Sequence, residues 1–263
     1  MIITPLQKKL RKKILLLASS TKSGHPHVGS CLSCIDILIQ TILFEMKPAD
    51  KFILSKGHAS LALYVVLNEK KKISDEALDT YFKEGGYFGI HPPSSYPKDI
   101  PLATGSLGHG LSFAAGVAKG YALQHKEAQR VFCLLSDGEC NEGAVWEAAL
   151  FASKHKLHNL VAFVDKNRWQ AFGRTRDVLG DAATSAKWRS FGFNVYKANG
   201  HSLSDLKKTF DKIRKTTNNK PHMVICKTYR AHGVGKLYDK LHSNYIPLDE
   251  KMLTSALATI EIV

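Results

Sequence analysis

The chain has 263 residues, of which 44% are hydrophobic, which is enough for the core of one large or two small globular domains. No apolar run reaches the roughly 18–20 residues of a membrane-spanning helix, so we expect no membrane protein. The 37 Lys and Arg residues outnumber the 23 Asp and Glu residues, but they are dispersed and no nucleic-acid-binding motif accompanies them. A solvated basic surface that attracts anionic ligands is therefore favoured over a nucleic-acid-binding module.

The first predicted element is an amphipathic helix over residues 6–19. Leu6, Leu10, Ile14 and Leu17 fall near one face of such a helix. The same stretch imitates a secretory signal, with basic, then apolar, then small residues, but its apolar part is too short. We expect a cytoplasmic protein.

The cysteine pattern agrees with a reducing compartment. Five cysteines are an odd count with no regular spacing, so free thiols are favoured over disulfides. Cys31 and Cys34 form a lone CxxC motif, and no zinc site is expected there because tetrahedral zinc takes four ligands.

Further along the chain, helical patterns alternate with short apolar runs. Helices are expected at 34–43, 58–68, 74–82, 109–125, 142–155 and 204–216. Strands are expected at 131–137, 160–165, 193–198 and 222–228. Strands alternating with helices predict a mostly parallel sheet with helices on both faces. We expect one α/β domain over residues 1–263 with a helical N-terminal portion, and long loops at 83–104, 166–190 and 229–248.

Two of the predicted strands end in acids. Asp137-Gly138 follows one strand, and Asp165 and Asn167 follow the next. Ligands of open parallel sheets bind beyond the carboxyl ends of the strands, so these groups can share one edge. Asp137, Asn167 and the carbonyl of Trp169 could supply oxygen ligands to Mg²⁺, Ca²⁺ or Mn²⁺, and Gly138 would let a phosphate approach. From this motif alone, acids that only cap strand ends and turns remain an equal alternative.

Upstream of this edge, four turns combine histidine with glycine or proline. They are SGHPHVGS (23–30), SKGHAS (55–60), GIHPP (89–93) and ATGSLGHG (103–110). Histidine exchanges protons near neutral pH. A single histidine in a loop is usually surface decoration, but four such turns before a candidate metal and phosphate edge favour a functional site.

Taken in order, SGHP, KGHA, TGSLGHGLSFAAGVA and SDGECNEGAVWEAALFASKHKLHNLVAFVDKN resemble the N-terminal half of transketolase, from about residue 10 to about residue 250. The resemblance implies the fold of a thiamine diphosphate-binding (diphosphate-type) domain and transfer of a two-carbon ketol unit from a ketose to an aldose. The cofactor supplies the electron sink, and the protein orients groups and moves protons.

The resemblance also implies roles for individual residues. Asp137, Asn167 and Trp169 match the metal ligands. The cofactor-binding positions are His58, Gly105, Leu107, Gly108, Asp137, Gly138, Asn167 and His242. The histidines that face the reacting carbon and the sugar are His25, His91 and His242. Glu142 and Glu147 match residues at the interface between protomers.

The chain lacks counterparts of the family's pyrimidine-binding and C-terminal domains. The resemblance therefore implies one subunit of a split transketolase, active only with a partner subunit that carries the pyrimidine-binding domain, in an α₂β₂ assembly. Sugars or sugar phosphates are the implied substrates. The main alternative is one subunit of another thiamine diphosphate enzyme, such as a 2-oxo acid dehydrogenase or decarboxylase.

Some positions depart from the family pattern. Ser136, His27 and His109 replace a usual glycine, glycine and glutamine, and GIHPP lacks an acid that the family carries. These changes leave the donor and acceptor sugars open. Ser136 is tolerable if the backbone there needs no positive φ.

Overall fold

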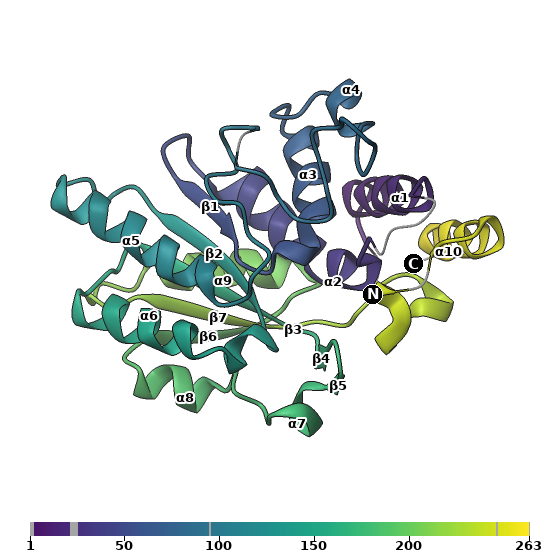
Figure 1. Cartoon of the computed structure of the whole chain (residues 1–263). Coiled ribbons are helices and arrows are strands. Elements are labelled where there is room, and N and C mark those ends of the chain that lie inside the picture. The colour runs from purple at the N-terminus through teal and green to yellow at the C-terminus, as the bar shows by residue number, and fades with distance from the viewer. Residues whose placement is uncertain (1–2, 22–25, 95, 246, 263) are drawn as a thin grey trace.

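The computed structural model describes residues 3–21, 26–94, 96–245 and 247–262. At its centre is a five-stranded sheet in the order β1-β2-β3-β7-β6, with every neighbouring pair parallel (Figure 1). The strands are β1 (Lys51–Leu54), β2 (Val131–Ser136), β3 (Leu160–Lys166), β6 (Asn194–Asn199) and β7 (His222–Lys227). A separate two-stranded hairpin pairs β4 (Trp169–Gln170) with β5 (Gly173–Arg174).

The central strands are apolar throughout because both faces of the sheet are covered. Successive side chains alternate between the faces. Leu134 and Phe163 therefore join one hydrophobic cluster, whereas Leu135 and Val164 join the other. This arrangement confirms the predicted parallel sheet with helices on both sides.

One face is covered by helices near the two ends of the chain and one from its middle, and the other face by helices of the central segment (Figure 1). The first group comprises α1 (Pro5–Ser19), α2 (Val28–Leu38), the π-helix η1 (Ile39–Glu45), α3 (Ser60–Glu69), α9 (Leu203–Arg214) and α10 (Glu250–Ile262). The second comprises α5 (His109–Leu123), α6 (Gly143–Lys154) and α8 (Ser185–Ser190). Two single-turn helices, α4 (Asp75–Leu78) and α7 (Thr175–Val178), lie in connections.

Several boundaries differ from the predicted ones. The helix expected from residue 34 begins at Val28, because this helix is buried on all sides and shows no amphipathic pattern that would mark its start. The strand β1 was missed because it has only four residues. The predicted loop 166–190 contains β4, β5, α7 and α8, and α10 was not predicted at all.

One helical stretch, Val28–Glu45, is long and apolar enough to cross a membrane by length and composition. No such stretch was expected from the sequence. However, 83% of it is buried within the fold, which is the pattern of a core helix.

The carboxyl ends of β1, β2, β3 and β7 bring distant segments together at one edge of the sheet. The segment after β1 carries Lys56 and His58, and the segment after β2 carries Asp137 and Gly138. The register aligns Ser136 at the end of β2 with Asp165 on β3, so the two acidic motifs lie side by side. The predicted meeting of these motifs at one edge is confirmed.

Candidate functional site

A cavity of about 490 Å³ lies at this edge. Its walls come from the loops that follow β1, β2, β3 and β7, from the start of α2 and from residues 91–107. Among its lining residues are His27, Ser30, His58, His91, Gly105, Leu107, Gly138, Asn167, Trp169, Arg230, Asn244 and Tyr245. A volume of this size suits a cofactor or a small substrate.

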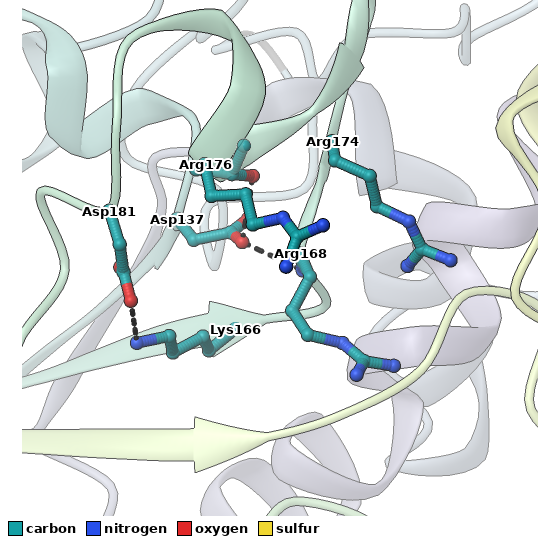
Figure 2. Close-up of a pocket in the computed structure, with 7 residues that line it drawn as sticks. Asp137, Lys166, Arg168, Arg174, Arg176 and Asp181 are labelled. Atoms are coloured by element: carbon teal, nitrogen blue, oxygen red, sulfur yellow. Dashed lines mark hydrogen bonds and ion pairs between the residues drawn. The ribbon is translucent and has the colours of Figure 1, made fainter.

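The carboxylate of Asp137 lies directly behind this cavity and lines a smaller one of about 360 Å³ (Figure 2). Its Oδ2 accepts hydrogen bonds from the backbone N–H of Arg168 at 2.7 Å and from Thr175 Oγ1 at 3.0 Å. Burial, together with the nearby charge of Asp165, raises the pKa of Asp137 to about 6. A buried carboxylate with a raised pKa gains most from a bound cation, which favours its ionised form.

Asn167 provides the second predicted ligand. Its side chain is buried and lines the large cavity, and its Oδ1 accepts the backbone N–H of Trp169 at 3.0 Å. Trp169 is also at the cavity, held by a hydrogen bond from its Nε1 to Asp239 at 2.8 Å and by Arg174, 3.7 Å from its ring centre. The predicted metal ligands Asp137, Asn167 and Trp169 therefore lie in one region.

Gly138 leaves no room for a side chain. A Cβ at this position would lie 2.8 Å from Cγ of Gln170, so any larger residue would displace the wall of the cavity. Gly108 has a φ of +90° and its N–H donates to the buried Glu139 at 2.9 Å. Glu139 also accepts the backbone N–H of Ser136 at 3.1 Å, so it joins the turn at 105–108 to the end of β2.

Three histidines line the cavity. The rings of His27 and His58 are 5.5 Å apart, and burial, followed by the charge of Lys56, lowers the pKa of His58 well below its usual value. Partial burial also lowers the pKa of His91, whose ring lies against Gly105. The imidazoles of His58 and His91 are therefore neutral near pH 7 and can accept a proton or a hydrogen bond.

His27 and Ser136 occupy positions where a glycine is usual. His27 has a φ of +48°, which costs a non-glycine residue conformational energy, and its imidazole takes up space in the cavity. Ser136 has no positive φ, so its side chain is tolerated, which meets the condition stated from the sequence. The exposed His109 begins α5 and is not among the residues of the cavity wall.

Arg230 is the main cavity residue that was not predicted from the sequence. Its side chain is buried, and Nη1 donates to the carbonyl of Leu241 at 3.1 Å, whereas Nε has no hydrogen-bond partner. A buried guanidinium with a free N–H at a cavity is suited to an anionic ligand. The rule that located Asp137, namely to look after each strand, would have found Arg230 just after β7.

Four predicted residues lie outside the described chain or are exposed to solvent. His25 lies outside the described residues. His242 is exposed, and its neighbours Asn244 and Tyr245 line the cavity instead. Glu142 is exposed at the cavity wall, and Glu147 is exposed on α6. The catalytic role of His242 and the interface role of both glutamates stay predictions.

The donor set fits a hard divalent cation bound together with a phosphate-bearing ligand. Within the described part of the chain, no group of three or more His, Cys, Asp and Glu side chains could hold a metal by itself. One carboxylate, one amide and one carbonyl would need ligand oxygens to complete the coordination shell. The free Nε of Arg230 and the space above Gly138 provide for such an anion. All five cysteines are buried and free, so no zinc or disulfide site competes.

Comparison with known proteins identifies relatives of this arrangement. Residues 8–256 match the family model described as "Transketolase, thiamine diphosphate binding domain". One of the two chains of the apulose-4-phosphate transketolase of Phocaeicola vulgatus is 38% identical over 236 residues, covering 86% of this chain and 82% of its own. The 6-deoxy-6-sulfo-D-fructose transketolase subunit SqwG of a Clostridium species is 32% identical, covering 94% and 92%.

Solved structures agree. The transketolase of Campylobacter jejuni superposes with a TM-score of 0.84 at 26% identity, covering 99% of this chain. This chain covers only 43% of that protein, so it spans less than half the length of the solved transketolases it matches.

Proposed function

Because the chain belongs to the transketolase family and corresponds to the thiamine diphosphate-binding part, we propose that it is one subunit of a split transketolase. Thiamine diphosphate and a divalent metal, Mg²⁺ first, are its cofactors. With a partner subunit it transfers a two-carbon ketol unit from a ketose to an aldose.

The observation that carries this proposal is the single cavity shared by His58, Gly138 and Asn167. These residues lie in loops after three different strands, and the family motifs that contain them were recognised separately in the sequence. A chain that had kept only the fold would have no reason to keep a buried carboxylate beside an open space above glycine.

The residues of this chain would act as follows. Asp137, Asn167 and the carbonyl of Trp169 would hold the metal, and Gly138, His58 and Arg230 would contact the diphosphate. Bound thiamine diphosphate supplies a carbanion-stabilising centre. Neutral His91 would accept or hold a proton at its ring nitrogen, and we extend the same role to His25 and His242.

The substrate class follows from charge and from the relatives. Two relatives are named for ketoses with a phosphate or a sulfonate group, and this chain carries a net charge of +14. We propose a ketose donor with a terminal anionic group, which the basic surface would attract.

The partner would be a C-terminal transketolase subunit that carries the pyrimidine-binding domain. Relatives named as single subunits and the exposed Glu142 and Glu147 beside the cavity support an α₂β₂ assembly. Five free, buried cysteines are in keeping with a cytoplasmic location.

The metal site is tested with Asp137→Ala and Asn167→Ala. Each variant is expected to lose metal-dependent binding of thiamine diphosphate while it stays folded, because each loses a ligand oxygen. Calorimetry in the presence of the partner subunit measures the affinity, and circular dichroism checks the fold. Unchanged affinity in both variants would rule out the site.

The reaction itself is tested by comparing a ketose phosphate with a 2-oxo acid as donor for the two-chain enzyme. Turnover of the ketose alone supports ketol transfer. Turnover of the 2-oxo acid alone would assign the chain to the dehydrogenase or decarboxylase branch of thiamine diphosphate enzymes.

A further inference from the structure

Asp165 is the acid of the second sequence motif that the proposed metal site does not use. It lies on β3 two residues before Asn167 and is fully buried. It is not among the residues that line the large cavity. Strand alternation places it on the same face as Phe163, toward α2, so it points into the protein behind the site.

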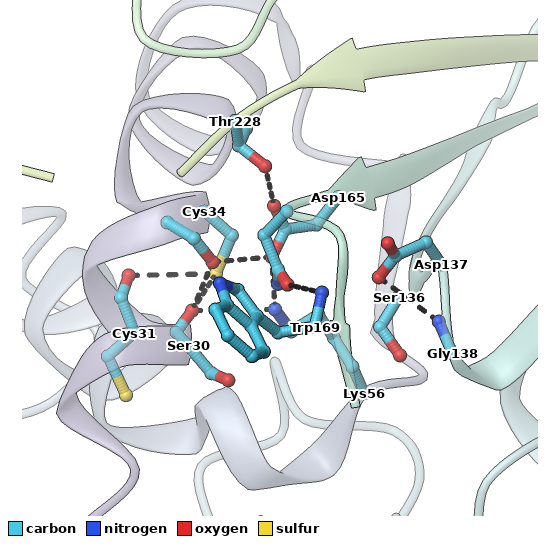
Figure 3. Close-up of polar contacts among 12 residues, drawn as sticks. Ser30, Cys31, Cys34, Lys56, Ser136, Asp137, Gly138, Asp165, Trp169 and Thr228 are labelled. Carbon is cyan, nitrogen blue, oxygen red and sulfur yellow. Dashed lines mark hydrogen bonds and ion pairs between the residues drawn. The ribbon is translucent and has the colours of Figure 1, made fainter. Parts of the chain in front are cut away.

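Four side chains from four segments donate to this carboxylate (Figure 3). Oδ2 accepts from Ser33 Oγ of α2 at 2.5 Å, from Lys56 Nζ after β1 and from Asn167 Nδ2 at 3.2 Å. Oδ1 accepts from Thr228 Oγ1 after β7. The network thus joins the ends of three strands to the helix that begins at the cavity.

Lys56 allows Asp165 to be charged inside the protein. The two side chains form an ion pair in which both are 0% exposed. A buried carboxylate without a cation would be strongly unfavourable. The charge matters because an ionised carboxylate only accepts hydrogen bonds and never donates them.

This property fixes the orientation of the Asn167 amide. The amide has one donor group and one acceptor atom, which differ little in shape. Its Nδ2 faces Asp165, so Oδ1 faces the opposite way, where it accepts the N–H of Trp169. A flipped amide would direct its oxygen at a carboxylate oxygen and lose both hydrogen bonds.

We propose that Asp165, kept ionised by Lys56, is a positioning residue that holds the Asn167 amide with its oxygen available to the metal. This inference rests on the proposed function, since it concerns the same metal site. Partners behind the direct ligands of protein metal sites commonly set metal affinity.

The experiment measures the Mg²⁺ concentration needed for half-maximal binding of thiamine diphosphate by the complex with the partner subunit. Asp165→Asn is expected to raise it at least about tenfold, because a neutral amide at 165 can face Asn167 in either orientation. In the exchanged variant, Asp165→Asn with Asn167→Asp, the Mg²⁺ requirement should return close to that of the wild type. A carboxylate ligand at 167 has two equivalent oxygens and needs no orientation.

A matched control and a fallback variant accompany this pair. Arg11→Met with Asp36→Leu replaces another buried ion pair, away from the cavity, and should leave the Mg²⁺ requirement unchanged. If Asp165→Asn does not fold by circular dichroism, Asp165→Leu with Lys56→Met removes both charges and the acceptor, and the same increase is expected.

The outcomes separate the inference from the proposed function. If the wild type shows no metal-dependent binding, the proposed function fails. If it binds but the Asp165 variants need no more Mg²⁺, or the exchanged variant is not rescued, Asp165 has only a structural role and the inference is overturned.

Discussion

Two ion pairs within the described residues are completely buried, Lys56–Asp165 and Arg11–Asp36. Each acid accepts several hydrogen bonds from different segments. Asp165 lies at the end of a strand and one of its donors is a proposed metal ligand. Asp36 lies in α2 and joins it to α1, far from any such ligand in sequence.

The contacts of Asp36 are those of a structural joint. Arg11 donates through both terminal nitrogens, at 2.8 and 2.5 Å, and Gln7 Nε2 donates at 2.8 Å. His201 Nε2 accepts the N–H of Tyr229 at 2.9 Å, so its Nδ1 carries the proton and faces Asp36 at 3.2 Å. The comparison teaches that the same buried chemistry serves assembly in one place and a binding site in the other, depending on one neighbour.

The largest effect that could break this comparison is expected from Arg11→Met. The variant leaves Asp36 buried without its cation and should lower the free energy of unfolding by about 3–5 kcal/mol. Urea denaturation measures this loss. The affinity of the folded protein for Mg²⁺ and thiamine diphosphate should not change.

A control separates charge from packing in that variant. Adding Asp36→Leu to Arg11→Met removes the uncompensated charge and should restore most of the stability. A fall in cofactor affinity in Arg11→Met similar to that in Asp165→Asn would show that the two networks do not differ in role.

A smaller effect is expected when each acid loses one peripheral donor. Thr228→Val and Gln7→Met each remove a hydrogen bond to a buried carboxylate and should cost about 1.5–3 kcal/mol of unfolding free energy. Thr228 does not donate to Asn167, so Thr228→Val should change the Mg²⁺ requirement less than Asp165→Asn does. The same calorimetric titration decides, and an equal change in both variants would contradict the orientation argument.

The smallest effect is a pH dependence near Asp36. His232 is stacked on His201 at 3.7 Å, and burial, followed by the charges of His201 and Arg11, lowers its pKa to about 3. An unfolded histidine takes up a proton below about pH 6.5, whereas folded His232 does not until about pH 3. The unfolded state therefore binds more protons in this window, and His232 makes stability fall as the pH falls.

One proton contributes at most about 1.4 kcal/mol per pH unit. His232→Phe keeps a ring against His201 and removes the titration. Urea denaturation between pH 5 and 7 should show a shallower loss of stability in this variant than in the wild type. Identical slopes would mean that His232 is already protonated in the fold.

Much of this molecule could be predicted from its sequence because apolar runs and strand ends are local signals. The short runs around Leu134 and Phe163 predicted the sheet, and the acids after them predicted the edge where Asp137 and Asn167 lie. The four-residue β1 and the all-round buried α2 carry weak patterns, and both were misjudged. Which helix covers which face of the sheet is not written in any local pattern.

That limit explains the errors at the site. Asp137 and Asp165 look alike in sequence, yet one lines a cavity and the other points toward α2, where Ser33 lies 132 positions away along the chain. His242 was chosen by a loose local match, and the conformation of its loop instead brings Asn244 and Tyr245 to the cavity. Arg230 was overlooked because it is a single basic residue in a chain rich in them.

The long separations around Asp165 also bear on how the chain folds. Its donors Ser33, Lys56 and Thr228 are 132, 109 and 63 positions away in the sequence. Closing such long loops costs entropy before any contact is gained, and proteins dominated by non-local contacts fold slowly. The carboxylate obtains its full set of donors only after most of the sheet has paired. During synthesis, the surroundings of Asp165 stay incomplete until the segment that carries Thr228 has left the ribosome.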